Sequence, residues 1–382
     1  MRRNEEIDRL RALAIVATVY AHIPDLWMWR VPFKETMRKF SAGYDGVLLF
    51  FTISGFVISA SLIPKLEKAV SEKESLSNVL LAFFCKRLFR ITPTATLWIA
   101  LTFLAAIIID PASVKGNVYA AIAALTNFFN VYVVSGYALP NAYGVYWSLS
   151  LEEQFYVALP IVFLLFKTTN GRLLTLLLIV AVTEFSGLQW IKGVFQIPPI
   201  VGGVSLYLID RKYGLLEKLR SSKFLSRGVL ILLAALLSVS IFVIPLIRPF
   251  TPHYLLIMGL VCTCLVCIAV LGKGSVLVIP GTERILYWLG SRSFTLYLTH
   301  LPMIYMVRYC WVVVGPHMGQ NYSADNNFAI FATWIVLTVL VTEFSYRFFE
   351  MPLLEKGRGI AGRIELIGNT KSVIGPVASS AL

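Results

Sequence analysis

The amino-acid sequence predicts an all-α protein, a polytopic integral membrane helical bundle of about ten transmembrane helices with both termini in the cytoplasm. Three observations support this fold class. Of the 382 residues, 57% are hydrophobic and only 14% are charged, and the mean hydropathy is +0.74, well outside the composition of soluble domains. The apolar residues form runs of roughly 20, the length that crosses a bilayer. Most Lys and Arg residues lie in short segments between these runs.

The expected spans are apolar runs bounded by charged or turn-forming residues, and placing the N-terminus inside puts the basic segments on the cytoplasmic side. The first run follows basic residues, as in a signal peptide, but it has full span length and no clear cleavage site, so we expect it to be retained. In chain order the spans are 10–29, 43–63, 91–110, 145–166, 172–190, 194–209, 229–247, 253–271, 293–314 and 327–346.

Segment 118–135 is long enough to cross the membrane but contains Asn127 and Asn130. Counting it as a span would place the basic loop 211–227 outside, so we expect this segment to lie along the outer interface or to re-enter. Segment 30–40 is an outward loop with four basic residues. This loop either lies near anionic headgroups or an anionic substrate, or has no binding role.

The run 194–209 contains two prolines and two adjacent glycines, a pattern that predicts a broken helix lining a cavity. We see no internal repeat, which weakens a transporter interpretation. Residues 1–356 are expected to form the membrane domain, and 357–382 a short, disordered cytoplasmic tail.

The net charge of +13 does not indicate nucleic-acid binding, because the basic residues follow the positive-inside pattern and no aromatic-basic module accompanies them. Cys262, Cys264 and Cys267 lie in one apolar run without a nearby His or carboxylate. We therefore expect packing cysteines and no metal site.

Two polar residues share one face of the first expected span. Arg11 and His22 are eleven residues apart, which is about 20° beyond three helical turns and about 16 Å along the axis. Asp8 precedes Arg11 by three residues and can pair with it. A lone histidine would be structural, but a cation on the same face favours a polar path into the membrane.

A second motif, WSLSLEE, places Glu152 and Glu153 at the start of a span, and adjacent residues point about 100° apart, so at most one faces a central cavity. A carboxylate against a histidine would fix the tautomer of the histidine and raise its basicity.

In a third motif, KRLFRITP, Arg87 and Arg90 share a helix face, and their guanidinium groups are suited to binding phosphate. The alternative is a cytoplasmic anchor.

In the ninth span, Ser293, Tyr297 and His300 recur on one helical face, which makes His300 a candidate cavity residue. A hydrogen bond between packed helices is the alternative. Glu350 closes the last motif, EFSYRFFEMP.

Taken together, the sequence resembles the membrane-bound acyltransferase family 3, integral membrane enzymes that acylate sugars and other hydroxyl compounds. The resemblance extends from the first span to the last. Its motifs, in the family's order, are IDRLRALAIVATVYAH, FFTISGFVIS, KRLFRITP, WSLSLEEQFY, SRSFTLYLTHLP and SYRFFEMP. Many members carry an additional extracytoplasmic hydrolase-like domain, which we do not expect after Leu382.

The resemblance implies that acyl-CoA, a substrate rather than a bound cofactor, donates an acyl group, commonly acetyl, to a hydroxyl of a cell-surface glycan or lipid-linked sugar at the bacterial cytoplasmic membrane. His22 would be the general base or carry the acyl group, Glu152 would orient it, and Arg11 would lie near the thioester. Arg87 and Arg90 would bind the CoA phosphates. The expected substrate-binding residues are Ser54, Trp147, Ser148, Tyr297 and His300.

A transporter or flippase for a lipid-linked or small glycan is the competing interpretation, because it would also place polar residues along a central pathway. A scaffold protein would leave the buried ionisable residues unexplained. The acceptor, the acyl length and the oligomeric state do not follow from the sequence.

Overall fold

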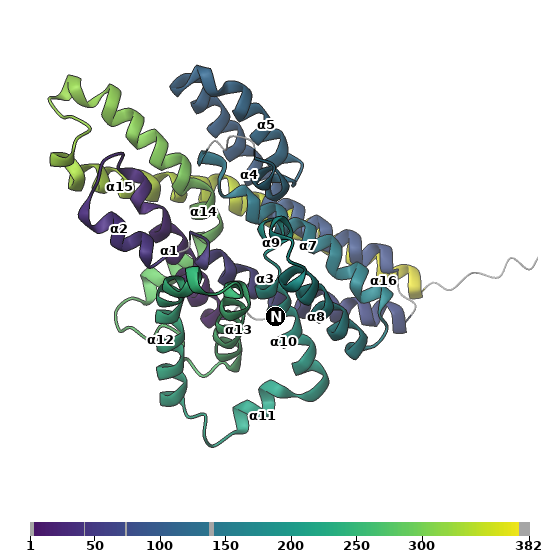
Figure 1. Ribbon diagram of the computed structural model, residues 1–382. Coiled ribbons are helices and arrows are strands. Elements are labelled where there is room, and N and C mark those ends of the chain that lie inside the picture. Colours follow the sequence, from purple (N-terminus) through teal and green to yellow (C-terminus); the bar gives the residue numbers. More distant parts are fainter. Residues whose placement is uncertain (1–3, 42, 73–74, 137–140, 374–382) are drawn as a thin grey trace, which may run out of the picture.

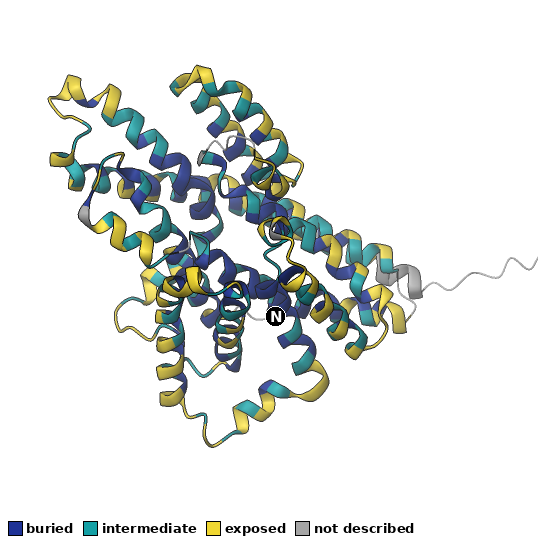
Figure 2. Cartoon of the chain, viewed as in Figure 1, coloured by how far each residue is buried: buried dark blue, intermediate teal, exposed yellow. Residues whose placement is uncertain are grey.

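The computed structural model describes residues 4–41, 43–72, 75–136 and 141–373, and these contain helices and no strand. Figure 1 shows a bundle in which α1 and α3 lie near the centre. Burial is concentrated in these central helices, whereas α5, α12 and α16 are exposed over much of their length (Figure 2). The central helices are α1 (Glu5–His22), α3 (Asp45–Ser71), α10 (Pro198–Tyr213), α13 (Tyr254–Leu271) and α14 (Glu283–Val313).

The other helices surround this centre. They are α2 (Pro32–Lys39), α4 (Leu76–Ile109), α5 (Val114–Leu125), α6 (Phe129–Val134), α7 (Tyr146–Leu165), α8 (Thr169–Phe185), α9 (Gln189–Val194), α11 (Leu215–Ser221), α12 (Arg227–Val243), α15 (Asn327–Ser345) and α16 (Met351–Val373). Each of the ten predicted spans overlaps one of the longer helices.

Within the described residues, six helical segments have the length and apolarity of a membrane span, which makes this chain an integral membrane protein. The remaining predicted spans correspond to α1, α8, α10 and α14, of which α8 and α10 have fewer than 18 residues and α1 and α14 carry several charges. The six segments are Asp45–Ser71, Leu76–Ile109, Tyr146–Leu165, Arg227–Phe250, Tyr254–Leu271 and Ala324–Ile367.

Close backbone contacts fix the central helices. A Cβ atom added to Gly46 of α3 would overlap the carbonyl oxygen of Ala14 in α1, and one added to Gly203 of α10 would overlap that of Thr52 in α3. Small residues at such positions let membrane helices approach closely. The relative depth of residues on α1, α3 and α10 is therefore fixed by backbone packing.

Several predicted boundaries were wrong. The first helix ends at His22 rather than at position 29, because Pro24 lacks the N–H that would continue the helix, and the short 3-10 turn η1 (Ile23–Leu26) follows. The third and ninth helices begin 15 and 10 residues earlier than the predicted positions 91 and 293, so the charged residues Arg87, Arg90 and Arg292 are also helical. The predicted loop 30–40 contains the helix α2.

The helix at 194–209 is interrupted as predicted, but at residues 195–197 and not at its prolines or glycines. Pro198 and Pro199 stand at the start of α10, where a missing N–H breaks no helical hydrogen bond, and the helix then continues to Tyr213. The break lies before the prolines, between α9 and α10.

Segment 118–135 forms two short helices, α5 and α6, interrupted at Asn127, which has a positive φ of 58°.

The tail predicted to be disordered is helical as far as Val373, where the described residues end. Two observations explain why α16 continues past position 356. Phe89 of α4 fills the space that a Cβ on Gly357 would occupy. Glu365 accepts hydrogen bonds from Lys65 of α3 at 2.7 Å and from Lys86 of α4 at 2.8 Å. Contacts with distant helices, which the local sequence does not show, thus order this segment.

Candidate functional site

A cavity of about 120 Å³ lies among α1, α3, α4, α7 and α14. It gathers seven of the ten residues predicted for the site, from five helices that are far apart in the sequence. These residues are Arg11, Ser54, Arg87, Arg90, Ser148, Glu152 and Tyr297. We call this the arginine cavity, and the corresponding end of α1 the Arg11 end.

The three arginines of the cavity have different surroundings. Arg11 Nη1 donates to Asp8 Oδ1 at 2.8 Å, which confirms the predicted pair. The guanidinium of Arg87 lies 5.7 Å from the ring centre of Phe83 and 5.5 Å from that of Tyr156. Its buried Nε has no hydrogen-bond partner among the described residues. Three cations thus face one cavity with donor capacity to spare, as an anion-binding site requires.

Glu152 supplies the carboxylate of the cavity. Its Oε1 accepts hydrogen bonds from Ser54 Oγ at 2.5 Å and from the hydroxyl of Tyr156 at 2.6 Å. Among the described residues, no hydrogen bond or ion pair joins Glu152 to His22, the pairing that the sequence suggested. The structure places Glu152 with the arginines, because it lies nearly two turns into α7, close to Tyr156 and Arg87.

Tyr297 connects the arginine cavity with the other end of α1. Its hydroxyl is hydrogen-bonded to Ser148 Oγ at 2.5 Å and donates to the carbonyl oxygen of Val145 at 3.0 Å. Its ring centre lies 5.9 Å from that of His300. Trp147 is apart from the arginine cavity and contacts the rings of Tyr44 and Phe51 at 6.4 and 5.9 Å.

His22 and His300 form a second site, which we call the two-histidine site, at the His22 end of α1. Their ring centres are 5.3 Å apart. Nδ1 of His300 lies 3.2 Å from the carbonyl oxygen of Leu296, and a carbonyl only accepts, so this nitrogen carries the proton. Nε2 of the fully buried His300 ring has no partner among the described residues. In the neutral ring it is a free hydrogen-bond acceptor.

Asp25 was not predicted, and it occupies the place that the sequence analysis gave to Glu152. Its Oδ2 lies 3.4 Å from His22 Nδ1, and its Oδ1 accepts a hydrogen bond of 3.5 Å from Arg38 of α2. Asp25 lies in the turn after α1. Burial acts to raise the pKa of its carboxyl, but the contacts with His22 and Arg38 outweigh this and lower the pKa. The i, i+3 spacing of His22 and Asp25 was visible in the sequence.

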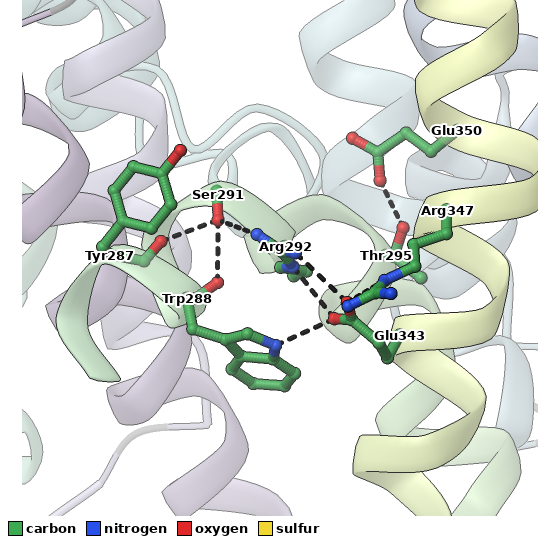
Figure 3. Close-up of polar contacts among 8 residues, drawn as sticks. All are labelled: Tyr287, Trp288, Ser291, Arg292, Thr295, Glu343, Arg347 and Glu350. Carbon is green, nitrogen blue, oxygen red and sulfur yellow. Dashed lines mark hydrogen bonds and ion pairs between the residues drawn. The ribbon is translucent and has the colours of Figure 1, made fainter. Parts of the chain in front are cut away.

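A third polar cluster lies where α14 begins and α15 ends (Figure 3). Glu343 accepts hydrogen bonds from the indole of Trp288 at 2.8 Å and from two guanidinium nitrogens of Arg292 at 3.0 and 3.2 Å, and it also binds Arg347. Glu350 accepts a hydrogen bond from Thr295 of α14 and ends the π-helix Tyr346–Glu350. The motif containing Glu350 therefore joins α15 to α14.

The helices and these sites define a class: an integral membrane protein with a basic cavity and a pair of histidines, one of them fully buried, on one helical bundle. The sequence pattern of the family described as "Acyltransferase domain" matches residues 4–346. The chain belongs to this acyltransferase family.

Named relatives agree with the family. The chain is 26% identical over 380 residues to the peptidoglycan O-acetyltransferase OatA of Listeria monocytogenes, covering 92% of this chain and 56% of the relative. It is 26% identical over 376 residues to O-acetyltransferase OatA of Staphylococcus aureus, with 92% and 57% covered. A putative peptidoglycan O-acetyltransferase, YrhL of Bacillus subtilis, is 22% identical over 377 residues, with 92% and 55% covered.

The chain thus spans little more than half the length of these curated relatives. No solved structure is significantly similar to it. The relatives point away from the transporter alternative, because their names describe group transfer.

Proposed function

We propose that this protein is an O-acyltransferase, most simply an O-acetyltransferase, that moves an acyl group from acyl-CoA to a hydroxyl of a glycan outside the cytoplasmic membrane. The observation that carries the proposal is the arrangement along α1. Arg11 opens on the arginine cavity, His22 belongs to the two-histidine site, and Tyr297 lies between the two. In this proposal the N-terminus and the Arg11 end face the cytoplasm.

The arginine cavity would bind the donor. Acyl-CoA carries several phosphate charges, and guanidinium groups bind phosphate through paired, charge-assisted hydrogen bonds. The free Nε of Arg87 supports this role for Arg87 and Arg90. Arg11 lies on the same wall and would face the part of the donor that enters deepest. The acyl thioester then has to reach His22, about 16 Å farther along the axis of α1.

The two-histidine site would bind the acceptor hydroxyl and remove its proton. His22, oriented by Asp25, takes the proton as general base while the hydroxyl oxygen attacks the thioester carbonyl. A new ester bond forms, the carbon–sulfur bond breaks, and the leaving thiolate receives a proton, so the protein returns to its starting state. His300 Nε2, a free acceptor beside His22, would hold a second hydroxyl of the acceptor.

A second version of this chemistry uses His22 as the nucleophile. An acyl-histidine would form with release of the thiol, and the acceptor hydroxyl would then displace the imidazole.

Glu152 takes no direct part in either version, because its carboxylate is bound to Ser54 and Tyr156 in the arginine cavity. It would balance the cations there. Two of the relatives are named peptidoglycan O-acetyltransferases, so a peptidoglycan-type glycan is the first acceptor to test.

The test is label transfer in membranes that contain the native acceptors. Membranes from cells expressing the protein receive acyl-CoA labelled in the acetyl group, and alkali-labile label is measured on glycans and lipids. We expect incorporation with the wild type and a loss of at least about a hundredfold with His22→Ala, the scale of a lost general base. His317→Ala changes an exposed histidine outside both sites and serves as the control.

Both variants are compared at equal membrane levels. Full activity of His22→Ala would remove His22 from the mechanism. Movement of an unmodified glycan across the membrane without label incorporation would contradict the acyltransferase proposal as a whole.

A further inference from the structure

A large apolar groove lies beside the two-histidine site, among α4, α5, α14 and α15. Its volume is about 810 Å³, several times the 120 Å³ of the arginine cavity. In Figure 1 the α4–α5 pair and the α14–α15 pair extend separately towards the top of the view. The residues that line the groove are Trp98, Leu101, Thr102, Ala105, Ala106, Ile109, Asp110, Ser113, Gly116, Asn117, Ala142, Pro302, Met303, Tyr305, Met306 and Val341.

The walls of this groove belong to membrane-spanning helices. Both α4 and α15 lie in segments long and apolar enough to cross a bilayer. From Trp98 to Ile109 the α4 wall extends about 16 Å, half of a hydrocarbon core. An apolar groove at this depth takes hydrocarbon rather than water. Four lining residues have no side chain beyond Cβ, namely Ala105, Ala106, Gly116 and Ala142, which leaves width for a branched chain.

The groove and the two-histidine site share the helix α14. Met303 lines the groove three residues after His300, about 4.5 Å along the axis. Trp334 of α15 donates from its indole nitrogen to the carbonyl oxygen of His300 at 3.4 Å. A chain lying in the groove would thus end within reach of the histidine pair.

Basic residues lie near the rim at the same end. Tyr305 lines the groove, and the guanidinium of Arg308 lies 5.6 Å from its ring centre. Arg308 and Lys34 are close enough to interact electrostatically, and Lys34 interacts likewise with Arg38. Arg38 in turn binds Asp25, the partner of His22. These three cations, which we call the rim cluster, outnumber the carboxylates of Asp25 and Glu35 beside them.

Polar groups also stand at one end of the groove itself. Asp110 and Ser113 lie where α4 meets α5, and Asn117 donates to the hydroxyl of Ser113 at 2.9 Å. Carboxylate, hydroxyl and amide groups are the usual partners of sugar hydroxyls. Apolar residues, a cation cluster and hydrogen-bonding groups therefore lie around this one groove.

We propose that the acceptor is a sugar linked to a polyprenyl phosphate, with the polyprenyl chain in the groove, the phosphate at the rim cluster and the sugar at the two-histidine site. This inference rests on the proposed function, since it names the substrate class of the same site. A two-chain glycolipid fits less well, because the groove is single. A soluble glycan would leave the groove and the rim cluster without an occupant.

The first experiment measures binding without turnover. The purified full-length protein in nanodiscs is irradiated with a polyprenyl phosphate that carries a photoreactive group on its chain, and the cross-linked peptides are identified by mass spectrometry. We expect cross-links to α14 around Met303 and Met306 and to α4. Ala106→Trp fills the groove and should reduce cross-linking about tenfold, equal to about 1.4 kcal/mol. Leu104→Trp, on the exposed side of the same helix, is the matched control.

The second experiment compares acceptors. Acetyl transfer from acetyl-CoA is measured to one sugar presented in three forms: free, linked to polyprenyl phosphate, and on a diacyl lipid. We expect a KM at least about tenfold lower for the polyprenyl-linked form. Ala106→Trp should raise that KM about tenfold and leave transfer to the free sugar unchanged.

The outcomes separate this inference from the proposed function. Equal KM values for the three forms, or cross-links spread over the lipid-exposed surface, would overturn the groove assignment while acyl transfer itself stands. A lower KM for the diacyl form would overturn it in favour of a glycolipid acceptor. Specific cross-linking in the groove without any acyl transfer would support a polyprenyl phosphate site and refute the acyltransferase function.

Discussion

The two ends of α1 handle charge in different ways. At the Arg11 end, three arginines share a cavity with Glu152. At the His22 end, the central groups are two imidazole rings 5.3 Å apart, with one carboxylate behind them. One buried ring nitrogen there, Nε2 of His300, has no partner among the described residues.

This difference fits two tasks. Fixed cations hold an anionic ligand but cannot exchange protons near neutral pH, whereas imidazole can take and return a proton. The Arg11 end is thus suited to binding and the His22 end to chemistry. If so, substitutions at the first should change KM for the donor, and substitutions at the second should change kcat.

The largest effect is expected for the double variant Arg87→Gln, Arg90→Gln. Each guanidinium–phosphate contact contributes about 1.5–3 kcal/mol, so the loss of two should raise KM for acyl-CoA at least about a hundredfold. Steady-state kinetics on purified protein measures this. Lys86→Gln, on the same turn of α4 but bound to Glu365, should leave KM unchanged. An unaltered KM in the double variant would exclude these arginines from donor binding.

A smaller effect is expected for Asp25→Asn at the opposite end. Loss of the carboxylate behind His22 removes its orientation and its charge, so kcat should fall by roughly tenfold while KM for acyl-CoA stays the same. Glu35→Gln, an equal charge change on the exposed face of α2, is the control. If kcat were unchanged by Asp25→Asn, the carboxylate would be a surface partner of Arg38 and no part of the site.

The smallest effect concerns the connection between the two ends. Tyr297→Phe deletes one hydroxyl and its bonds to Ser148 and Val145, which are worth about 1 kcal/mol. The kcat for acyl transfer should fall about fivefold, while KM for acyl-CoA and KM for the acceptor stay the same. Tyr119→Phe, at an exposed position of α5, should have no effect. A change confined to KM for acyl-CoA would assign Tyr297 to the donor site alone and would break the proposed connection.

Local spacing in the sequence predicted much of this arrangement. The Asp8–Arg11 pair follows from an i, i+3 spacing on one helix, and it is confirmed at 2.8 Å. Arg87 and Arg90 share a helix face in the same way, and both line the cavity. Such predictions hold because a helix fixes the relation between residues three or four apart, whatever surrounds it.

Relations between helices were less predictable. Glu152 was expected beside His22 and lies with the arginines, whereas Asp25, three residues after His22, was overlooked. The depth at which α7 packs against α1 and α4 decides which partner Glu152 meets, and no residue within α7 encodes that depth alone. The ordered tail likewise depends on Lys65 and Lys86, roughly 300 positions away in the chain.

The sequence by itself determined the membrane class, the approximate helices, the common face of Arg11 and His22, and the motifs of the family, because hydrophobicity and helical period are local properties. Only the tertiary structure decided that Glu152 completes the arginine cavity, that His300 lies against His22, and that an apolar groove begins beside them. These features arise where helices distant in sequence pack at a fixed depth. That depth is set by close contacts such as Gly46 against Ala14, which the sequence does not pair.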